Sequence, residues 1–73
     1  MGEVARVTEI TARSTEGWED AVRVGLERAN AELHGVRSAW IKEQKVECTD
    51  GRISAYQVDM LVTYVLDADD SLG

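Results

Sequence analysis

The sequence predicts an α+β fold whose elements follow the order β-α-β-β, and three observations support this. Residues 18–33 have apolar side chains in steps of three and four, which is helical periodicity. Residues 4–12, 36–48 and 53–66 are rich in β-branched or alternating apolar residues, which is typical of strands. The 73-residue chain contains no proline, which agrees with long uninterrupted strands.

The first strand, residues 4–12, leads directly into the predicted helix. Ser14 or Thr15 is the expected N-cap, because its hydroxyl can accept a hydrogen bond from a free backbone N–H. Gly35 follows the helix and can take the left-handed conformation that ends it. The acidic residues that favour the positive end of the helix dipole are Glu16, Glu19 and Asp20. The stripe expected in the core contains Trp18, Ala21, Val22, Gly25, Leu26, Ala29 and Leu33.

The second and third strands are predicted to form a long hairpin. Asp50-Gly51 favours a tight turn, since both residue types accept positive φ angles. Strand side chains alternate between faces, so the third strand has two different faces. The helix is expected to cover the apolar face formed by Tyr56, Val58, Met60, Val62, Tyr64 and Leu66. The opposite face is expected to carry Leu61, Val65, Val36, Trp40 and Val46.

One helix cannot cover both faces of so long a hairpin, which predicts self-association. Burying five apolar side chains could contribute on the order of 10 kcal/mol, at roughly 2 kcal/mol each. Cys48 is the only cysteine and His34 the only histidine, so an intrachain disulfide and a four-ligand zinc site are excluded. A homo-oligomer therefore becomes the leading source of extra stability. The alternative is that these residues are scattered surface apolar residues.

The charge pattern restricts the partners. The net charge is −6 and the isoelectric point is about 4.6. An acidic chain is poorly suited to nucleic acid or to an anionic membrane. We expect neither a membrane span nor a signal peptide, because no apolar run is long enough and the first residues lack a basic region. A lone cysteine fits a reducing compartment, so a cytoplasmic location is expected.

The order and spacing of several segments resemble the dodecin family. A short strand leads into "STEGWEDAVRVGLERA", and then come a strand with a tryptophan, an Asp-Gly turn and a "YQV" strand. The resemblance covers residues 4–67. The resemblance implies a three-stranded antiparallel sheet partly wrapped around one helix. From its length, the chain is expected to form a single domain over residues 1–73, with an ordered core at about 4–67 and an acidic C-terminal tail.

Members of this family assemble as hollow dodecamers whose sheets face inward. Well-studied members bind flavins such as FMN or riboflavin as stacked pairs near subunit contacts. The resemblance thus implies a protein that stores or sequesters flavin and is not an enzyme.

Four residues of this chain match the family's flavin site or lie near it. Gln57 matches the glutamine that contacts the flavin ring, and Lys45 matches a basic residue near the flavin phosphate. Ser38 occupies the position of the stacking tryptophan, and the nearest indole is Trp40, about 7 Å further along the strand. Gln57 is expected across from Gln44, with Trp40 about 13 Å away. A pocket that uses both side chains would therefore have to be shared between copies.

Each assignment has an alternative. Trp40 could fill a subunit contact, where tryptophan is enriched, Gln57 could be an ordinary sheet residue, and Lys45 a solvated charge. The alternative function is a dodecin-like structural or cation-binding oligomer that has lost flavin binding, with carboxylates such as Asp59 facing inward. An enzyme is the weakest reading, because His34 lies at a predicted helix end, where it would interact with the helix dipole.

Overall fold

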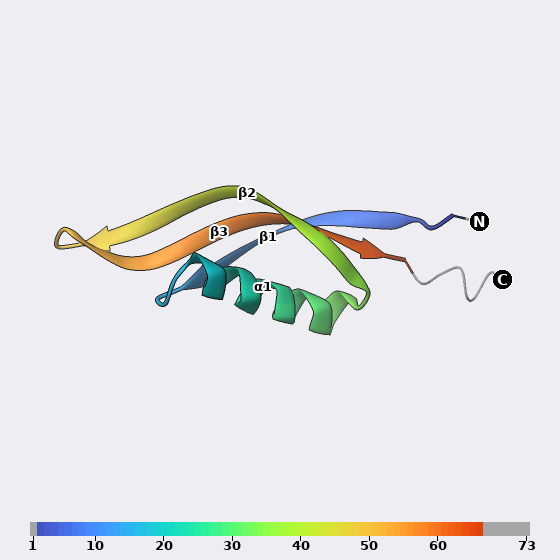
Figure 1. The fold of residues 1–73 in the computed structure, drawn as a ribbon, viewed down its shortest axis with the longest axis horizontal. Helices are drawn as coiled ribbons and strands as arrows, with labels where there is room; N and C mark the ends of the chain where they lie inside the picture. Colours follow the sequence, from blue (N-terminus) through green and yellow to red (C-terminus); the bar gives the residue numbers. More distant parts are fainter. Residues whose placement is uncertain (1, 67–73) are drawn as a thin grey trace.

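The computed structural model describes residues 2–66, which form three strands and one helix. The elements are β1 (Ala5–Ser14), α1 (Trp18–Leu33), β2 (Val36–Thr49) and β3 (Arg52–Val65). The strands form one antiparallel sheet in the order β1-β3-β2, and α1 lies along one face of it (Figure 1). The predicted β-α-β-β fold is confirmed. The predicted acidic tail lies outside the described residues.

The core lies between α1 and the central strand. Val58, Met60 and Val62 of β3 face the helix and are fully buried, at 0% exposure. Each such side chain stabilises the fold by roughly 1.5–3 kcal/mol. The buried positions of α1 are Ala21, Gly25 and Ala29. Their spacing of four places these small residues on one side of the helix, so α1 can lie close to the sheet.

The start of α1 differs from the prediction. Gly17 is the N-cap and makes no side-chain capping bond. The Ser14 hydroxyl instead accepts a hydrogen bond from the backbone N–H of Glu16 at 2.9 Å and donates one to Oδ2 of Asp20 at 2.6 Å. Ser14 or Thr15 as N-cap was therefore wrong, because β1 extends to Ser14. The serine links the end of β1 to the first turn of α1.

The end of α1 and the hairpin turn use left-handed backbone as predicted. His34 and Gly35 have φ angles of 61° and 62°, and the Gly35 carbonyl accepts a 3.1 Å hydrogen bond from the Val65 N–H. Asp50 and Gly51 have φ angles of 55° and 77°, as a two-residue type I′ turn requires. β2 and β3 each contain 14 residues. Figure 1 shows that their hairpin extends well beyond α1 and β1.

Three bulges change the alternation of the hairpin. The β2–β3 register shifts between Val36 and Ser38, between Ile41 and Glu43, and between Glu47 and Cys48. The extra residues are Arg37 and Lys42 on β2 and Ser54 on β3. Each extra residue moves the following pairs by one position, so side chains beyond a bulge change faces relative to an unbroken ladder.

The bulges correct the prediction for two valines. Val36 pairs with Tyr64 and Val46 pairs with Tyr56, so both lie on the helix side. Their assignment to the opposite face was wrong, because it assumed a register without bulges from the turn onward. The Ser54 bulge changes the face of Val46, and the Arg37 bulge changes the face of Val36. Trp40 pairs with Leu61, which keeps it on the face away from the helix as predicted. Val65 belongs to that face too, by alternation from Leu61.

Trp18 lies at the rim of the core instead of inside it. Its side chain is 39% exposed, although it opens the helical stripe. The indole packs edge-on against Tyr56, with ring centroids 5.3 Å apart and an interplanar angle of 74°. Its Nε1–H donates to the Lys45 carbonyl at 3.4 Å. Trp18 thus attaches the start of the helix to β2 and β3 where the hairpin leaves the core.

We predict that Gly25→Ala destabilises the fold by up to about 2 kcal/mol. A Cβ at this position would lie 2.7 Å from Cε of Met60 and 2.9 Å from Cβ of Ala12. Overpacking of a core costs about 1–3 kcal/mol, and the better helix propensity of alanine offsets about 1 kcal/mol. The measurement is chemical or thermal unfolding. Gly2→Ala is the control, because a Cβ there meets nothing within 4 Å and Gly2 lies outside every helix and strand. Equal stability of the two variants would contradict the close approach of α1 to β1 and β3.

We predict that the Ser14–Asp20 contact makes stability fall at acidic pH. The hydrogen bond from Ser14, and next that from Arg23, holds the pKa of Asp20 below its ordinary value of 3.8. Such a carboxylate adds stability that is present above the unfolded pKa and is lost as pH falls through the folded pKa. Unfolding temperatures measured from about pH 5 down to about pH 3 should fall more steeply for the wild type than for Asp20→Asn. Ser14→Ala should flatten the curve in the same direction. Parallel curves for all three proteins would rule this linkage out.

Candidate functional site

The sheet face opposite α1, called the open face below, is covered by no other element of the described chain. The observed register and the alternation of strand side chains show which residues point to this face. Along the strands, the face has two different halves. The half nearer the hairpin turn is polar, and the other half is more apolar. The polar half carries Thr11, Arg13, Glu43, Lys45, Gln57 and Asp59. The other half carries Val7, Ser38, Trp40, Leu61, Thr63 and Val65.

A small pocket of about 240 Å³ lies in the polar half of the open face. Its lining residues are Glu43, Gln44, Lys45, Gln57 and Asp59. Lys45 pairs with Gln57, and Glu43 pairs with Asp59 one step along the same face. Directly paired side chains begin about 5 Å apart. The four side chains therefore form a compact polar square.

Hydrogen bonds orient one side of this square. The carboxylate of Asp59 accepts a 3.0 Å hydrogen bond from Oγ1 of Thr11 on the neighbouring strand β1. The same oxygen, Oδ1, accepts a second and longer hydrogen bond, of 3.4 Å, from Nε2 of Gln57. Asp59 and Gln57 are half-buried, whereas Glu43 and Lys45 are exposed. β2 thus supplies one exposed charge of each sign, and the central strand β3 supplies the half-buried groups.

Three ion pairs span the open face across β3. Arg13 of β1 pairs with Glu47 of β2, in register with Gln57 and Ala55 of the central strand. Lys42 and Arg37 are the bulge residues of β2, and they reach Glu9 at 3.2 Å and Glu3 at 3.3 Å. Exposed pairs of this kind contribute only about 0–1 kcal/mol each. Their main effect is to neutralise Arg13 and Lys42, which lie close to the pocket, and Arg37, which lies further along the face.

The structure brings together only two of the four predicted site residues. Gln57 lies opposite Lys45, beside the pocket. It does not lie opposite Gln44 as predicted, because the Ser54 bulge adds one residue between the turn and the pocket. Trp40 pairs with Leu61, four residues along β3 from Gln57 and therefore about 13 Å away. Ser38 pairs with Thr63, another two residues along.

Trp40 is the most exposed large apolar side chain of the described residues, at 68%. One chain therefore separates the indole from the amide, as the sequence predicted. The roles of Trp40, Gln57, Ser38 and Lys45 in binding remain predictions. Sequence reasoning missed Glu43 and Thr11 as neighbours of Gln57. No signal in the sequence marks them, because their position depends on the bulges and on the β1–β3 register.

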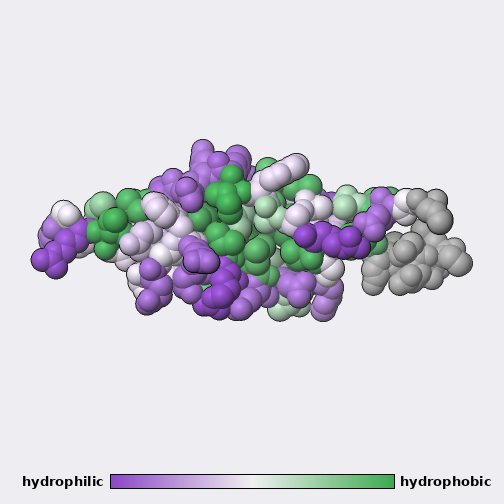
Figure 2. Space-filling model, viewed as in Figure 1, coloured by the Kyte–Doolittle hydropathy of each residue, from purple (hydrophilic) through white to green (hydrophobic). Residues whose placement is uncertain are grey.

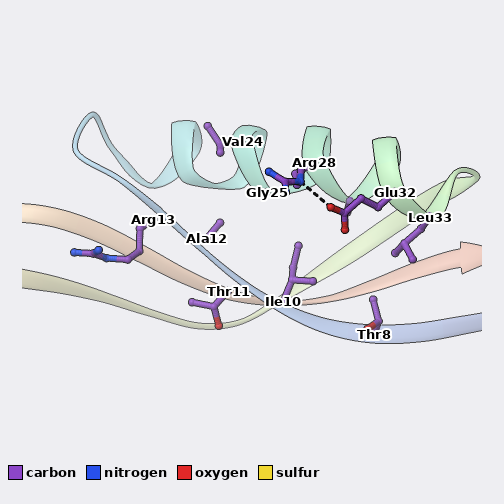
Figure 3. Close-up of a pocket in the computed structure, with 11 residues that line it drawn as sticks. Thr8, Ile10, Thr11, Ala12, Arg13, Val24, Gly25, Arg28, Glu32 and Leu33 are labelled. Carbon is purple, nitrogen blue, oxygen red and sulfur yellow. Dashed lines mark hydrogen bonds and ion pairs between the residues drawn. The ribbon is translucent and has the colours of Figure 1, made fainter.

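A second hollow, of about 430 Å³, lies on the other side of the sheet between α1 and β1 (Figure 3). In Figure 3, Ile10 and Ala12 point from β1 toward the helix, whereas Thr11 points away toward the open face. Val24 and Leu33 line the helical wall, and the 2.8 Å Arg28–Glu32 ion pair lies beside the hollow. β1 is an edge strand here, so this hollow lies along an unpaired edge of the sheet.

The exposed apolar groups extend beyond these hollows. Hydrophobic groups run along the middle of the view in Figure 2, with hydrophilic groups above and below them. Among residues 2–66, no three His, Cys, Asp or Glu side chains are grouped in a way that could hold a metal ion. The one helix in this part of the chain is neither long nor apolar enough to span a membrane.

Comparison with known proteins assigns the family. The model of the Dodecin family matches residues 4–67. Dodecin from Streptomyces davaonensis is 36% identical, with a TM-score of 0.88 over 92% of this chain and 98% of that chain. A variant of Thermus thermophilus dodecin is 29% identical, with a TM-score of 0.85 over 90% and 98% of the two chains.

A third similar structure is the calcium dodecin of Mycobacterium tuberculosis, a calcium-chelating antigen. It is 26% identical, with a TM-score of 0.76 over 86% of this chain and 90% of that chain. A search of curated proteins gave no match. The family match covers most of the chain, and the structures agree with it in topology as well as in sequence. This chain therefore belongs to the dodecin family.

Proposed function

We propose that this protein stores or sequesters a flavin, FMN or riboflavin, in a closed homododecamer that holds the ligand at subunit contacts. One observation carries the proposal: Gln57 and Lys45 lie directly opposite each other beside a pocket on an open sheet face. Both residues match positions that the family resemblance associates with flavin. Membership of the dodecin family supports the same ligand class.

The chemistry of the pocket suits the polar edge of a flavin ring. A side-chain amide both donates and accepts hydrogen bonds, which matches the alternating donors and acceptors of the flavin pyrimidine edge. Gln57 is half-buried and its Nε2 lies within 3.4 Å of Asp59, so the amide is held in place by a neighbouring side chain. A ring bound here also needs an aromatic surface. Within one chain, Trp40 is about 13 Å away, so the surface would have to come from another copy.

Assembly is supported by the apolar groups that the fold leaves exposed. Trp40 and Val7 of the open face are 68% and 53% exposed. The hollow along β1 and α1 leaves further apolar groups uncovered on the other side of the sheet. A chain of 73 residues buries a small hydrophobic core, so leaving further apolar groups in water lowers its already limited stability. Burial of these groups between copies would stabilise each subunit.

The proposed role is binding and not catalysis, in a cytoplasmic setting. The pocket offers carboxylates, an amide and an ammonium group, and His34 lies at the far end of α1 instead of in the pocket. The only cysteine, Cys48, is an exposed free thiol near the hairpin turn. A reducing compartment keeps such a thiol in this form.

A second candidate is a structural or cation-binding oligomer that has lost flavin binding. The observation in its favour is that Glu43 and Asp59 face each other, since like charges at paired positions are destabilising unless something neutralises them. The serine at the family's stacking position favours it too, and one similar structure is that of a calcium dodecin. Two carboxylates are fewer than calcium usually takes, so further ligands would have to come from other copies.

We predict a native particle of twelve copies, with about twelve times the chain mass of 8.1 kDa. The measurement is native mass spectrometry or light scattering of the purified chain. Trp40→Ala separates the two roles of this residue. Loss of the particle would assign Trp40 to a subunit contact, whereas loss of flavin binding by an intact particle would assign it to the ligand. A stable monomer in dilute solution would contradict the assembly.

We predict that micromolar protein quenches the fluorescence of riboflavin and that Gln57→Ala weakens the binding about tenfold. Loss of hydrogen bonds to the ligand at one buried edge corresponds to about 1.4 kcal/mol. Thr15→Ala is the control, because Thr15 is a polar residue between β1 and α1 that does not line the pocket. Absence of quenching, combined with calcium-dependent stabilisation of the particle, would support the cation-binding alternative instead.

A further inference from the structure

The charges around the pocket, taken with the proposed function, distinguish between flavins with and without a phosphate. Riboflavin is uncharged at neutral pH, whereas the phosphate of FMN carries about −1.5 to −2 charges. The ring can be bound in the same way in both. Preference between the two ligands therefore depends on the net charge that the phosphate meets at and around the pocket.

The cations that flank the pocket already form ion pairs with carboxylates of the same chain. Arg13 and Lys42 beside the pocket pair with Glu47 and Glu9, and further along the open face Arg37 pairs with Glu3. A phosphate that recruited Arg13 would leave Glu47 without its partner on the same face. The exchange would replace one anion by another, so it offers little net attraction. The three pairs thus contribute no net charge to the ligand's surroundings.

The pocket itself then carries a net negative charge. Its lining contains one cation, Lys45, and two anions, Glu43 and Asp59, which gives a net charge of −1. None of these three makes an ion pair within residues 2–66. All belong to one square of paired positions, so a phosphate near Lys45 also lies near both carboxylates.

Assembly would strengthen this effect. Each copy carries a net charge of −6. Copies that meet at their open faces would bring several such pockets close together. The summed negative potential would oppose entry of a dianion more than entry of an uncharged ring.

From this balance we infer that the site selects an uncharged flavin, such as riboflavin, and discriminates against FMN. The inference rests on the proposed function and specifies its ligand. Lys45 is one cation beside two carboxylates, so the pocket lacks the excess of positive charge that a phosphate site requires.

The test compares the dissociation constants of riboflavin and FMN for the full-length protein by fluorescence quenching. At about 10 mM salt, riboflavin should bind about tenfold more tightly, which corresponds to about 1.4 kcal/mol. The ratio should shrink toward one at about 1 M salt, where the Debye length falls from about 30 Å to about 3 Å. Tighter binding of FMN at low salt would overturn the inference and leave the proposed function intact. Failure of both flavins to bind would overturn the proposed function as well.

Charge variants test the cause of the preference. Glu43→Gln should raise FMN affinity relative to riboflavin about threefold, and Lys45→Gln should lower it by a similar factor. Glu19→Gln is the matched control, since it removes the same charge from the start of α1 and not from the open face. It should leave the ratio of the two dissociation constants unchanged. A change in the ratio as large for Glu19→Gln as for Glu43→Gln would show that net protein charge, and not the pocket, sets the preference.

Discussion

The architecture depends on the unequal coverage of the two faces of one sheet. A helix of 16 residues lies against a hairpin whose strands have 14 residues each, and it can shelter only the middle of one face. On that face, Val58, Met60 and Val62 are fully buried. On the other face, Trp40 remains largely exposed. The same helix thus completes the core and leaves a broad open face for another purpose.

Much of the fold could be predicted because local signals agree with one another. The helical stripe, the Asp50-Gly51 turn and the apolar alternation of β3 each point to the element that is observed. The prediction was wrong where a residue's position depends on distant partners. Val36 and Val46 were assigned to the wrong face because bulges are not marked by residue type. Trp18 was expected in the core, but the hairpin leaves the helix near its start, so the indole remains at the rim.

The candidate site was predictable only in part, for the same reason. Family resemblance identifies Gln57 and Lys45, and the register places them opposite each other. Two carboxylates, Glu43 and Asp59, set the charge of the pocket. They are neighbours because β2 pairs with β3, in a register that the Ser54 bulge shifts by one residue from the turn. The distance between Trp40 and Gln57 was predicted correctly because the Lys42 bulge offsets the Ser54 bulge, so Trp40 pairs with Leu61 as in an unbroken register.

The Ser54 bulge has a consequence for how this hairpin can change in evolution. It lies between the turn and the pocket, so it decides whether odd or even positions of β2 share a face with Gln57. Insertions or deletions at the tip are tolerated in length, since the arm projects freely from the body of the molecule (Figure 1). The number of residues added or removed in one strand matters, however. A change of one residue in β2 without the same change in β3 would place opposite Gln57 a neighbour of Lys45 that points to the helix. Related chains should therefore gain or lose the same number of residues in β2 and β3 of this arm. Where the two strands change by different numbers, the position of the bulge should change as well.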